Sequence, residues 1–336
     1  MRRDVTAARV GVGFSRGLSP REIVECARLA EDLGYDSVWV AEGHSGDQFA
    51  ILGACAAATR RIRLGTAISS VFVRSATTIA MAAATVDHLS GGRLVLGLGT
   101  SHREQVEPEH GVPFVAPTAR LRDVVEIVRA LLRDGTVTHR GRVVTIERFD
   151  LWFRPVRREI PIYLAGLFSP MLELAGETAQ GALLTWPTLE APARAAGHVA
   201  AGARRAGRRP QDVEVASIVP CAVAPDRREA LDRMRASVAF YAGFFPRYSR
   251  LLAESGFADA TRTIKAAWDA GDRARATSLV PDALVEAVAL VGPTEDCRAR
   301  LAAYREAGLA LPIVTPRVDG PDALAQALAV VRAMAP

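Results

Sequence analysis

Hydroxyl and imidazole side chains follow two segments of the sequence that we expect to be neighbouring strands. The segments are residues 61–68 and 93–99, and the alanine-rich residues 75–88, with apolar side chains at helical spacing, lie between them. The second segment is apolar enough to be buried on both faces, which is typical of parallel strands. A strand–helix–strand unit of this length is a right-handed crossover whose active groups lie just after each strand. The polar residues that we therefore expect on one rim are Ser69, Ser70, Thr100, Ser101 and His102.

An acid and a histidine, Glu42 and His44, follow a further expected strand, residues 36–41. A carboxylate and an imidazole at the end of such a strand can relay a proton, so both are candidate catalytic residues. The alternative for His44 is a surface or structural histidine. The alternative for Glu42 is an acid at a helix N-terminus that interacts only with the helix dipole.

The same alternation of strand and helix recurs along the whole chain. It predicts an α/β fold, and eight units favour a single closed (β/α)8 TIM barrel over an open doubly wound sheet. A last helix is expected over residues 322–334. The eight expected strands are residues 10–14, 36–41, 61–68, 93–99, 161–165, 181–185, 213–223 and 312–315.

At 336 residues, the chain is longer than a plain barrel of roughly 250 residues. Three insertions into one domain account for the surplus: a loop near residues 101–118, a hairpin near 136–146 and a helical, aromatic-rich segment near 237–278. The aromatic side chains of the third insertion have two interpretations. They either pack the insertion onto the barrel or form a lid over a substrate.

The composition is that of an ordinary soluble protein, with 49% hydrophobic and 24% charged residues and no apolar run long enough to span a bilayer. The first ten residues lack the apolar core of a signal peptide. Four scattered cysteines suit a reducing cytosol, so we expect a cytoplasmic protein. The net charge of +5 comes from arginines dispersed among acids, which predicts a solvated surface that does not bind nucleic acid.

Several cofactor motifs are absent or incomplete in the sequence. Gly97-Leu98-Gly99 is half of a dinucleotide fingerprint, but His102 stands where the third glycine belongs. Residues 101–110 are rich in His and Glu, yet they form one irregular loop and nothing elsewhere completes a ligand shell. We therefore expect no metal site.

Two motifs carry a family resemblance. VWVAEGHSGDQFAILGACAAATRRIRLGTAI (38–68) and ATVDHLSGGRLVLGLGTS (84–101) resemble the luciferase-like superfamily of flavin and deazaflavin enzymes, and residues 279–314 are similar to its closing segment. Within it, the chain looks like the oxidoreductases that use the deazaflavin coenzyme F420. These include methylenetetrahydromethanopterin reductases and deazaflavin-dependent glucose-6-phosphate dehydrogenases.

The resemblance implies where the coenzyme binds. A non-proline cis peptide at Ala67-Ile68 would back the tricyclic ring, the alternative being a plain strand end. Gly99, Thr100 and Ser101 would contact the polar edge of the ring. His102 stands where the sugar-phosphate dehydrogenases have an acid, so their substrate is not inferred, although His102 stays among the cofactor-binding candidates. The residues that would bind the phosphate of the coenzyme's tail, at a helix N-terminus and beside it, are Ala165, Gly166, Leu167, Phe168, Ser169 and Thr185.

The function implied by the resemblance is hydride transfer between coenzyme F420 and a small organic substrate, with His44 as the proton carrier. One alternative is a monooxygenase that uses reduced flavin mononucleotide (FMN) and oxygen. Another is a non-catalytic binding protein that has kept the barrel. Relatives often pair through barrel helices, so the resemblance also implies a homodimer.

Overall fold

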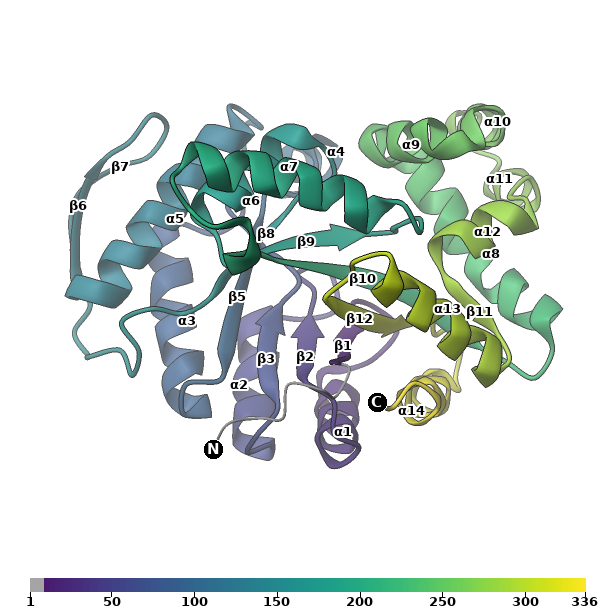
Figure 1. Cartoon of the computed structure of the whole chain (residues 1–336), viewed down its shortest axis with the longest axis horizontal. Helices are drawn as coiled ribbons and strands as arrows, with labels where there is room; N and C mark the ends of the chain where they lie inside the picture. Colours follow the sequence, from purple (N-terminus) through teal and green to yellow (C-terminus); the bar gives the residue numbers. More distant parts are fainter. Residues whose placement is uncertain (1–8) are drawn as a thin grey trace.

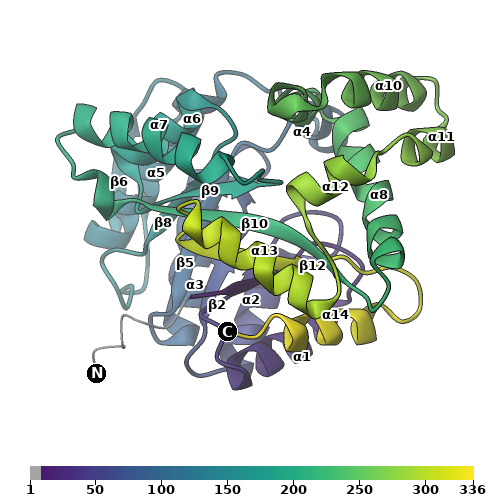
Figure 2. The same cartoon turned by 45° about the vertical axis from the view of Figure 1, so that its right-hand side comes forward.

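The computed structural model describes residues 9–336 (Figures 1 and 2). Within these residues, eight parallel strands close a barrel in chain order, because the pairing runs from one strand to the next and β10 pairs with both β9 and β12. This confirms the predicted (β/α)8 barrel. The expectation about a signal peptide falls on residues that lie largely outside the described range. The barrel strands are β1 (Gly11–Phe14), β2 (Ser37–Val40), β3 (Arg63–Thr66), β5 (Leu94–Gly99), β8 (Ile162–Ala165), β9 (Gly181–Thr185), β10 (Glu214–Val223) and β12 (Leu311–Pro316).

Helices surround the barrel, and local sequence fixes where several of them begin. In α1, the N-cap residue Ser19 and Glu22 form a reciprocal capping box, and Pro20 occupies the first helical position. In α3, Ser75 caps the first turn, and Gly91 ends the helix in the left-handed conformation at φ 66°. The helices of the outer ring are α1 (Pro20–Asp32), α2 (Gln48–Ala58), α3 (Ala76–Ser90), α5 (Pro117–Asp134), α6 (Ser169–Thr178), α7 (Ala191–Arg205), α13 (Thr294–Glu306) and α14 (Ala323–Ala333).

The barrel interior is filled by large side chains, so the barrel is a packed core and not a pore. Trp39 is fully buried there, and its indole N–H donates to Ser37 Oγ at 2.8 Å. Gly65 faces this ring, since a Cβ at that position would lie 2.3 Å from Trp39 Cε3. The buried residues that share this interior cluster are Trp39, Val95, Tyr163, Leu183, Ala216, Leu311 and Ile313.

The first two insertions differ in detail from the prediction. Residues 101–118 were expected as a loop but contain α4 (Arg103–His110), in which Val106 is fully buried and Arg103 pairs with Glu107. The hairpin extends past residue 146, because its strands are β6 (Thr136–Arg140) and β7 (Thr145–Asp150). Two short strands were not expected: β4 (Ser69–Ser70), which pairs with β5, and β11 (Leu290–Gly292), which pairs with β10.

The third insertion is helical, as expected, but its first helix begins ten residues earlier, at Arg227. Figures 1 and 2 show it on the opposite side of the molecule from the β6–β7 hairpin. Its side chains form a second buried cluster that includes Trp186 of the barrel. Its elements are α8 (Arg227–Phe244), α9 (Pro246–Leu252), a π-helical turn (Ala253–Phe257), α10 (Ala258–Asp269), α11 (Arg273–Ser278) and the following α12 (Asp282–Val288).

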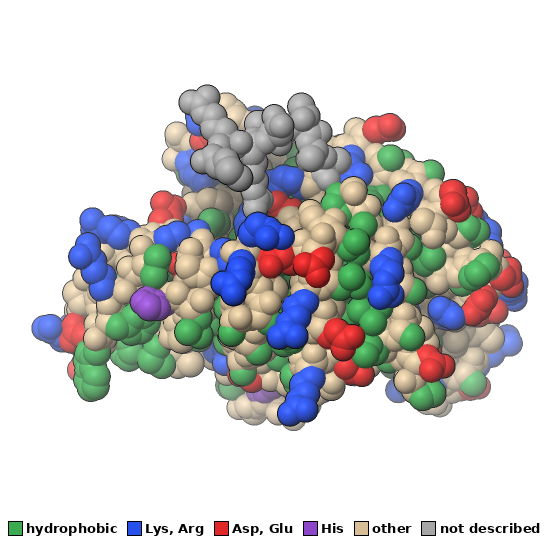
Figure 3. Space-filling model, turned by 90° about the horizontal axis from the view of Figure 1, so that it is seen from below, with side chains coloured by type: hydrophobic (Ala, Val, Ile, Leu, Met, Phe, Trp, Pro, Cys, Tyr) green, Lys and Arg blue, Asp and Glu red, His purple; other side chains and the backbone are tan. Residues whose placement is uncertain are grey.

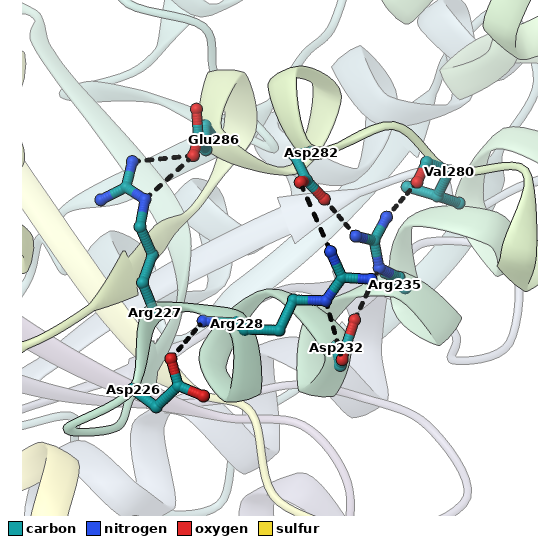
Figure 4. Close-up of polar contacts among 8 residues, drawn as sticks. All are labelled: Asp226, Arg227, Arg228, Asp232, Arg235, Val280, Asp282 and Glu286. Carbon is teal, nitrogen blue, oxygen red and sulfur yellow. Dashed lines mark hydrogen bonds and ion pairs between the residues drawn. The ribbon is translucent and has the colours of Figure 1, made fainter.

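Ion pairs fix α8 against α12 (Figure 4). Arg235 donates to the Val280 carbonyl and to the carboxylates of Asp282 and Asp232. The Arg235 side chain is only 13% exposed, whereas Arg228, which reaches the same two acids at 3.4 and 3.9 Å, is 67% exposed. A buried guanidinium that serves three acceptors orients α8 more strongly than the exposed one.

Charged side chains of both signs are intermingled on the face of the molecule seen in Figure 3, as expected of a solvated surface. None of the helices within residues 9–336 combines the length and the apolar character that crossing a membrane requires.

Replacing Arg235 tests this attachment. We expect Arg235→Gln to lower the free energy of unfolding by about 2 kcal/mol, because three acceptors lose a charged donor. Arg228→Gln, the control, should change it by less than about 0.5 kcal/mol. Urea unfolding followed by circular dichroism measures both. Equal effects of the two substitutions would contradict this assignment.

Candidate active site

The C-terminal mouth of the barrel has an apolar floor. Ala67, Ile68 and Ile218 lie on top of the interior cluster and are partly exposed. The peptide bond between Ala67 and Ile68 is cis, at the place where the resemblance located it. An accessible apolar surface at the mouth of a barrel suits one face of a flat ring. Ile218 was missed by sequence reasoning, since it lies in the middle of a strand.

Two glycines of β5 make room for this floor. A Cβ on Gly97 would lie 1.9 Å from the Thr66 carbonyl oxygen, and one on Gly99 would lie 2.7 Å from Ile68 Cδ1. Thr66 Oγ1 also donates to the Gly97 carbonyl at 2.7 Å. The absence of a side chain at Gly99 therefore makes room for Ile68. From the resemblance, we expected it to let the ring of the coenzyme approach the backbone.

The predicted rim of hydroxyl groups is assembled where β4 pairs with β5. Ser69 lies opposite Leu98, and Ser70 lies opposite Gly99, directly before Thr100. Ser69 Oγ is buried and has no hydrogen-bond partner within the part of the chain that the structure describes. Ser101 has a left-handed backbone, with φ 53°, and is partly exposed like Thr100. An unsatisfied hydroxyl beside exposed polar backbone suits the polar edge of a heterocycle.

Glu42 and His44 have different partners. The Glu42 carboxylate pairs with Arg74 and accepts the Ser70 backbone N–H at 2.7 Å. Its side chain is 16% exposed. Glu42 thus fixes the backbone of β4, which adjoins the floor.

The His44 side chain lies at the outer edge of the mouth. It is 78% exposed, and its Nε2 lies 3.1 Å from Glu109 Oε2 on α4. The structure therefore pairs His44 with an acid of the first insertion and not with Glu42. Sequence reasoning missed Glu109 because α4 was expected to be an irregular loop.

His102 is mostly buried beneath the third insertion. Its ring centroid lies 4.5 Å from that of Phe245 and 5.2 Å from that of Tyr248. Burial, together with the charge of Arg247, lowers the pKa of His102 to about 4. Its Nδ1 has no hydrogen-bond partner among residues 9–336. Near neutral pH, His102 is therefore an uncharged ring with one N–H to donate. Phe245 and Tyr248 also show that aromatic residues of the third insertion contact the rim as well as one another.

A pocket opens between the loops that follow β8 and β9. Its lining includes Gly166, Leu167 and Thr185 of the predicted phosphate site. A Cβ on Gly166 would lie 3.1 Å from Leu172 Cδ2 and Met171 Cβ, so this turn accommodates only glycine without a shift.

The other predicted residues of this site lie at the start of α6. Ala165 ends β8, Phe168 precedes the helix without a side-chain cap, and Ser169 begins it. The Phe168 ring lies beneath the Arg250 guanidinium, at 4.6 Å. Pro170 has no N–H, and the amides of Met171 and Leu172 donate to the Phe168 carbonyl. The positive end of the helix dipole still suits an anion beside Ser169.

An arginine completes the lining of this pocket. Arg194 lies in the first turns of α7, which begins soon after β9 ends. Sequence reasoning left the basic partner of a phosphate unassigned. The signal was present, since α7 starts at the same rim and Arg194 is its first basic residue. Leu251 and Ser255 of the third insertion also line this pocket, and Tyr248 lies near the Thr185 side chain.

Comparison with known proteins places this chain in a family. The chain matches the family described as luciferase-like monooxygenase over residues 5–311. The protein belongs to this family.

Relatives within this luciferase-like family extend over nearly the whole chain. A Mycobacterium tuberculosis protein, named provisionally as a coenzyme F420-dependent oxidoreductase, is 29% identical and covers 90% of this chain and 93% of its own. The 5,10-methylenetetrahydromethanopterin reductase of Methanolobus tindarius is also 29% identical, over 87% of this chain and 89% of its own. The coenzyme F420-dependent tetrahydromethanopterin reductase of Methanopyrus kandleri has the same fold, with a TM-score of 0.85 at 24% identity over 98% of both chains.

Within residues 9–336, no three His, Cys, Asp or Glu side chains are grouped closely enough to hold a metal ion.

The pKa of His102 makes stability depend on pH. Between about pH 6.5 and pH 4 the unfolded chain binds a proton that folded His102 does not, so the free energy of unfolding falls as the pH is lowered. The loss is about 3 kcal/mol at most. We expect His102→Asn to remove this part of the pH dependence.

Urea unfolding at a series of pH values measures the effect. His88→Asn, a change at an exposed histidine of α3, is the control and should keep the wild-type profile. A His102→Asn profile parallel to that of the wild type would show that His102 is not a buried neutral ring.

Proposed function

We propose that this protein is an F420-dependent oxidoreductase that transfers a hydride between the coenzyme and a small organic substrate. The observation that supports it most is the position of two features at one mouth. The partly exposed floor of Ala67, Ile68 and Ile218 suits a flat ring, and the start of α6 with Arg194 suits a phosphate. The names of the relatives agree with this combination.

The residues at the mouth fit the ring of this coenzyme. Ile68 and Ile218 would support one face, and the buried Ser69 hydroxyl lacks a partner that a polar ring edge can supply. Thr100 and Ser101 offer further hydroxyl and amide groups beside it. Bound F420 supplies hydride chemistry at ring position five, and the protein supplies position and electrostatics.

The tail phosphate would bind at the start of α6. Its amides carry the positive end of the helix dipole, and Arg194 adds a full charge. Gly166 lets the turn before α6 pack closely against Met171 and Leu172. Ala165, Leu167, Phe168 and Thr185 complete the proposed site.

The proton that accompanies hydride transfer is assigned to His44. Its exposed position at the edge of the mouth lets it exchange protons with solvent, and Glu109 orients its ring. Glu42 contributes indirectly, because its contacts with Arg74 and Ser70 hold the backbone next to the floor.

Coenzyme binding tests the site. We expect the protein to bind F420 more tightly than FMN, and Arg194→Gln to weaken F420 binding about tenfold, the loss of a charge-assisted hydrogen bond. The control, Arg204→Gln, removes an exposed arginine from the same helix and should change the affinity little. Equilibrium titration followed by coenzyme absorbance measures both.

The same titration distinguishes the proposed function from that of a flavin monooxygenase. Tighter binding of FMN, with oxygen consumption when the flavin is reduced, would instead support a flavin monooxygenase. Binding of neither coenzyme would contradict both.

Replacing His44 tests the proton carrier. In a screen of small alcohols and carbonyl compounds followed by coenzyme absorbance, we expect His44→Asn to lower the maximum rate by about a hundredfold, the usual contribution of a general acid or base. The dissociation constant of F420 should not change. The control His88→Asn should keep the full rate, and unchanged turnover by His44→Asn would exclude His44 from the reaction.

A further inference from the structure

Two arginines lie at the side of the mouth that the proposed coenzyme site leaves unused. Arg16 follows β1, and Arg317 follows β12, and these two strands are paired in parallel. In the order of the barrel, β1 lies opposite β8, and β12 lies opposite β5. The arginines are therefore across the mouth from the loops proposed to bind the ring edge and the phosphate.

Neither guanidinium forms an ion pair with an acid in the part of the chain that the structure describes. Arg317 is partly buried, and its Nε has no acceptor among residues 9–336. Burial and the charge of Arg16 lower the pKa of Arg317, against a weaker opposite effect of Asp319. Within the described residues, Arg16 donates to Ser237 Oγ alone, at 3.3 Å. The two loops that carry the arginines are in contact, since a Cβ on Gly17 would lie 2.6 Å from Val318 Cγ2. Two like charges on adjoining loops favour the binding of an anion.

Hydroxyl groups surround the arginine pair. Tyr241 on α8 is partly buried, four residues after Ser237, the residue that accepts from Arg16. The charges of both guanidiniums offset part of the rise in the pKa of Tyr241 that burial causes. Its ring centroid lies 4.7 Å from that of Trp186. Thr315 Oγ1 is buried without a partner in the described chain.

Thr315 connects this group to the floor. A Cβ on Gly13 would lie 2.7 Å from Thr315 Oγ1 and 3.8 Å from Ile218 Cδ1, so the unsatisfied hydroxyl lies next to a floor residue. A molecule held by the arginines would therefore extend towards the floor, where the ring of the coenzyme is proposed to lie.

We propose that Arg16 and Arg317, with Tyr241 and Thr315, bind the oxyanion of the substrate, a carboxylate or phosphate ester, and so select small anionic substrates. The planar fork of a guanidinium group can donate two hydrogen bonds to two oxygens of a carboxylate or a phosphate. This inference rests on the proposed function for its statement about substrate. The binding of the anion itself does not depend on F420.

Anion binding to the protein without coenzyme is the test. Inorganic phosphate and acetate, the two probes, are added up to roughly 10 mM at constant ionic strength, a range suited to millimolar dissociation constants. Tryptophan fluorescence reports binding, since Trp186 contacts Tyr241. We expect a saturable change with at least one probe, weakened tenfold or more in Arg317→Gln and in Arg16→Gln.

Two control variants distinguish specific binding by Arg16 and Arg317 from a non-specific effect of the protein's positive charge. Arg21→Gln removes an exposed arginine of α1 and should keep wild-type anion binding. Arg317→Lys keeps the charge without the planar fork and should bind more weakly than the wild type. Thermal unfolding of each variant checks that it is folded. No saturable response in the wild type, or an equal loss in Arg21→Gln, would overturn the proposal.

F420 titration of the same variants shows whether the arginines bind the anionic group of a substrate or the tail of the coenzyme. Unchanged F420 affinity in Arg317→Gln, with anion binding lost, supports a substrate site. An equal loss of F420 affinity would show that the arginines hold the tail of the coenzyme, which overturns the substrate assignment. If the wild type binds the anion through these arginines but does not bind F420, the proposed function fails while the anion site stands.

Discussion

The close approach of β3 to β5 is the constraint on which the mouth of this barrel depends. At Gly97 there is no room for a side chain, because the Thr66 carbonyl occupies the position of a Cβ. This approach brings Ile68 over the barrel core, where it forms the floor with Ala67 and Ile218. It also lets β4 pair with β5, which sets the hydroxyl rim beside that floor. A substitution at Gly97 would therefore disturb the floor and the rim together.

The two sides of the mouth differ in their charged side chains, and the third insertion contacts both of them. On the β8 side, α6 and Arg194 line a pocket suited to phosphate. On the β1 and β12 side, Arg16 and Arg317 form no ion pair with any acid of residues 9–336. The third insertion spans both, since Tyr241 contacts the arginine side and Tyr248 reaches Thr185 and His102. Its buried cluster, which includes Trp186, packs it against the barrel, and the contacts of Arg235 join α8 to the segment that leads into α12.

The fold and the rim could be predicted from the sequence, because they depend on short-range patterns. Each barrel strand is a short apolar run, and parallel strands deliver the residues after them to one end. The capping box at Ser19 and the left-handed stop at Gly91 are equally local.

The partners of the polar groups could not be predicted. His44 meets Glu109, 65 residues away, on a helix whose pattern was hidden by charged residues and Pro108. Arg16 meets Ser237, 221 residues away. His102 is buried by Phe245, in an insertion whose packing no local pattern defines. Such contacts follow from tertiary packing, which a periodic pattern does not encode.

A crystal structure of the protein with F420 bound tests the central claim most directly. The account predicts the flat ring on Ile68 and Ile218, the tail phosphate at the start of α6 beside Arg194, and Arg16 and Arg317 free of the coenzyme. A ring bound away from this floor, or a phosphate bound elsewhere than at α6, would contradict it.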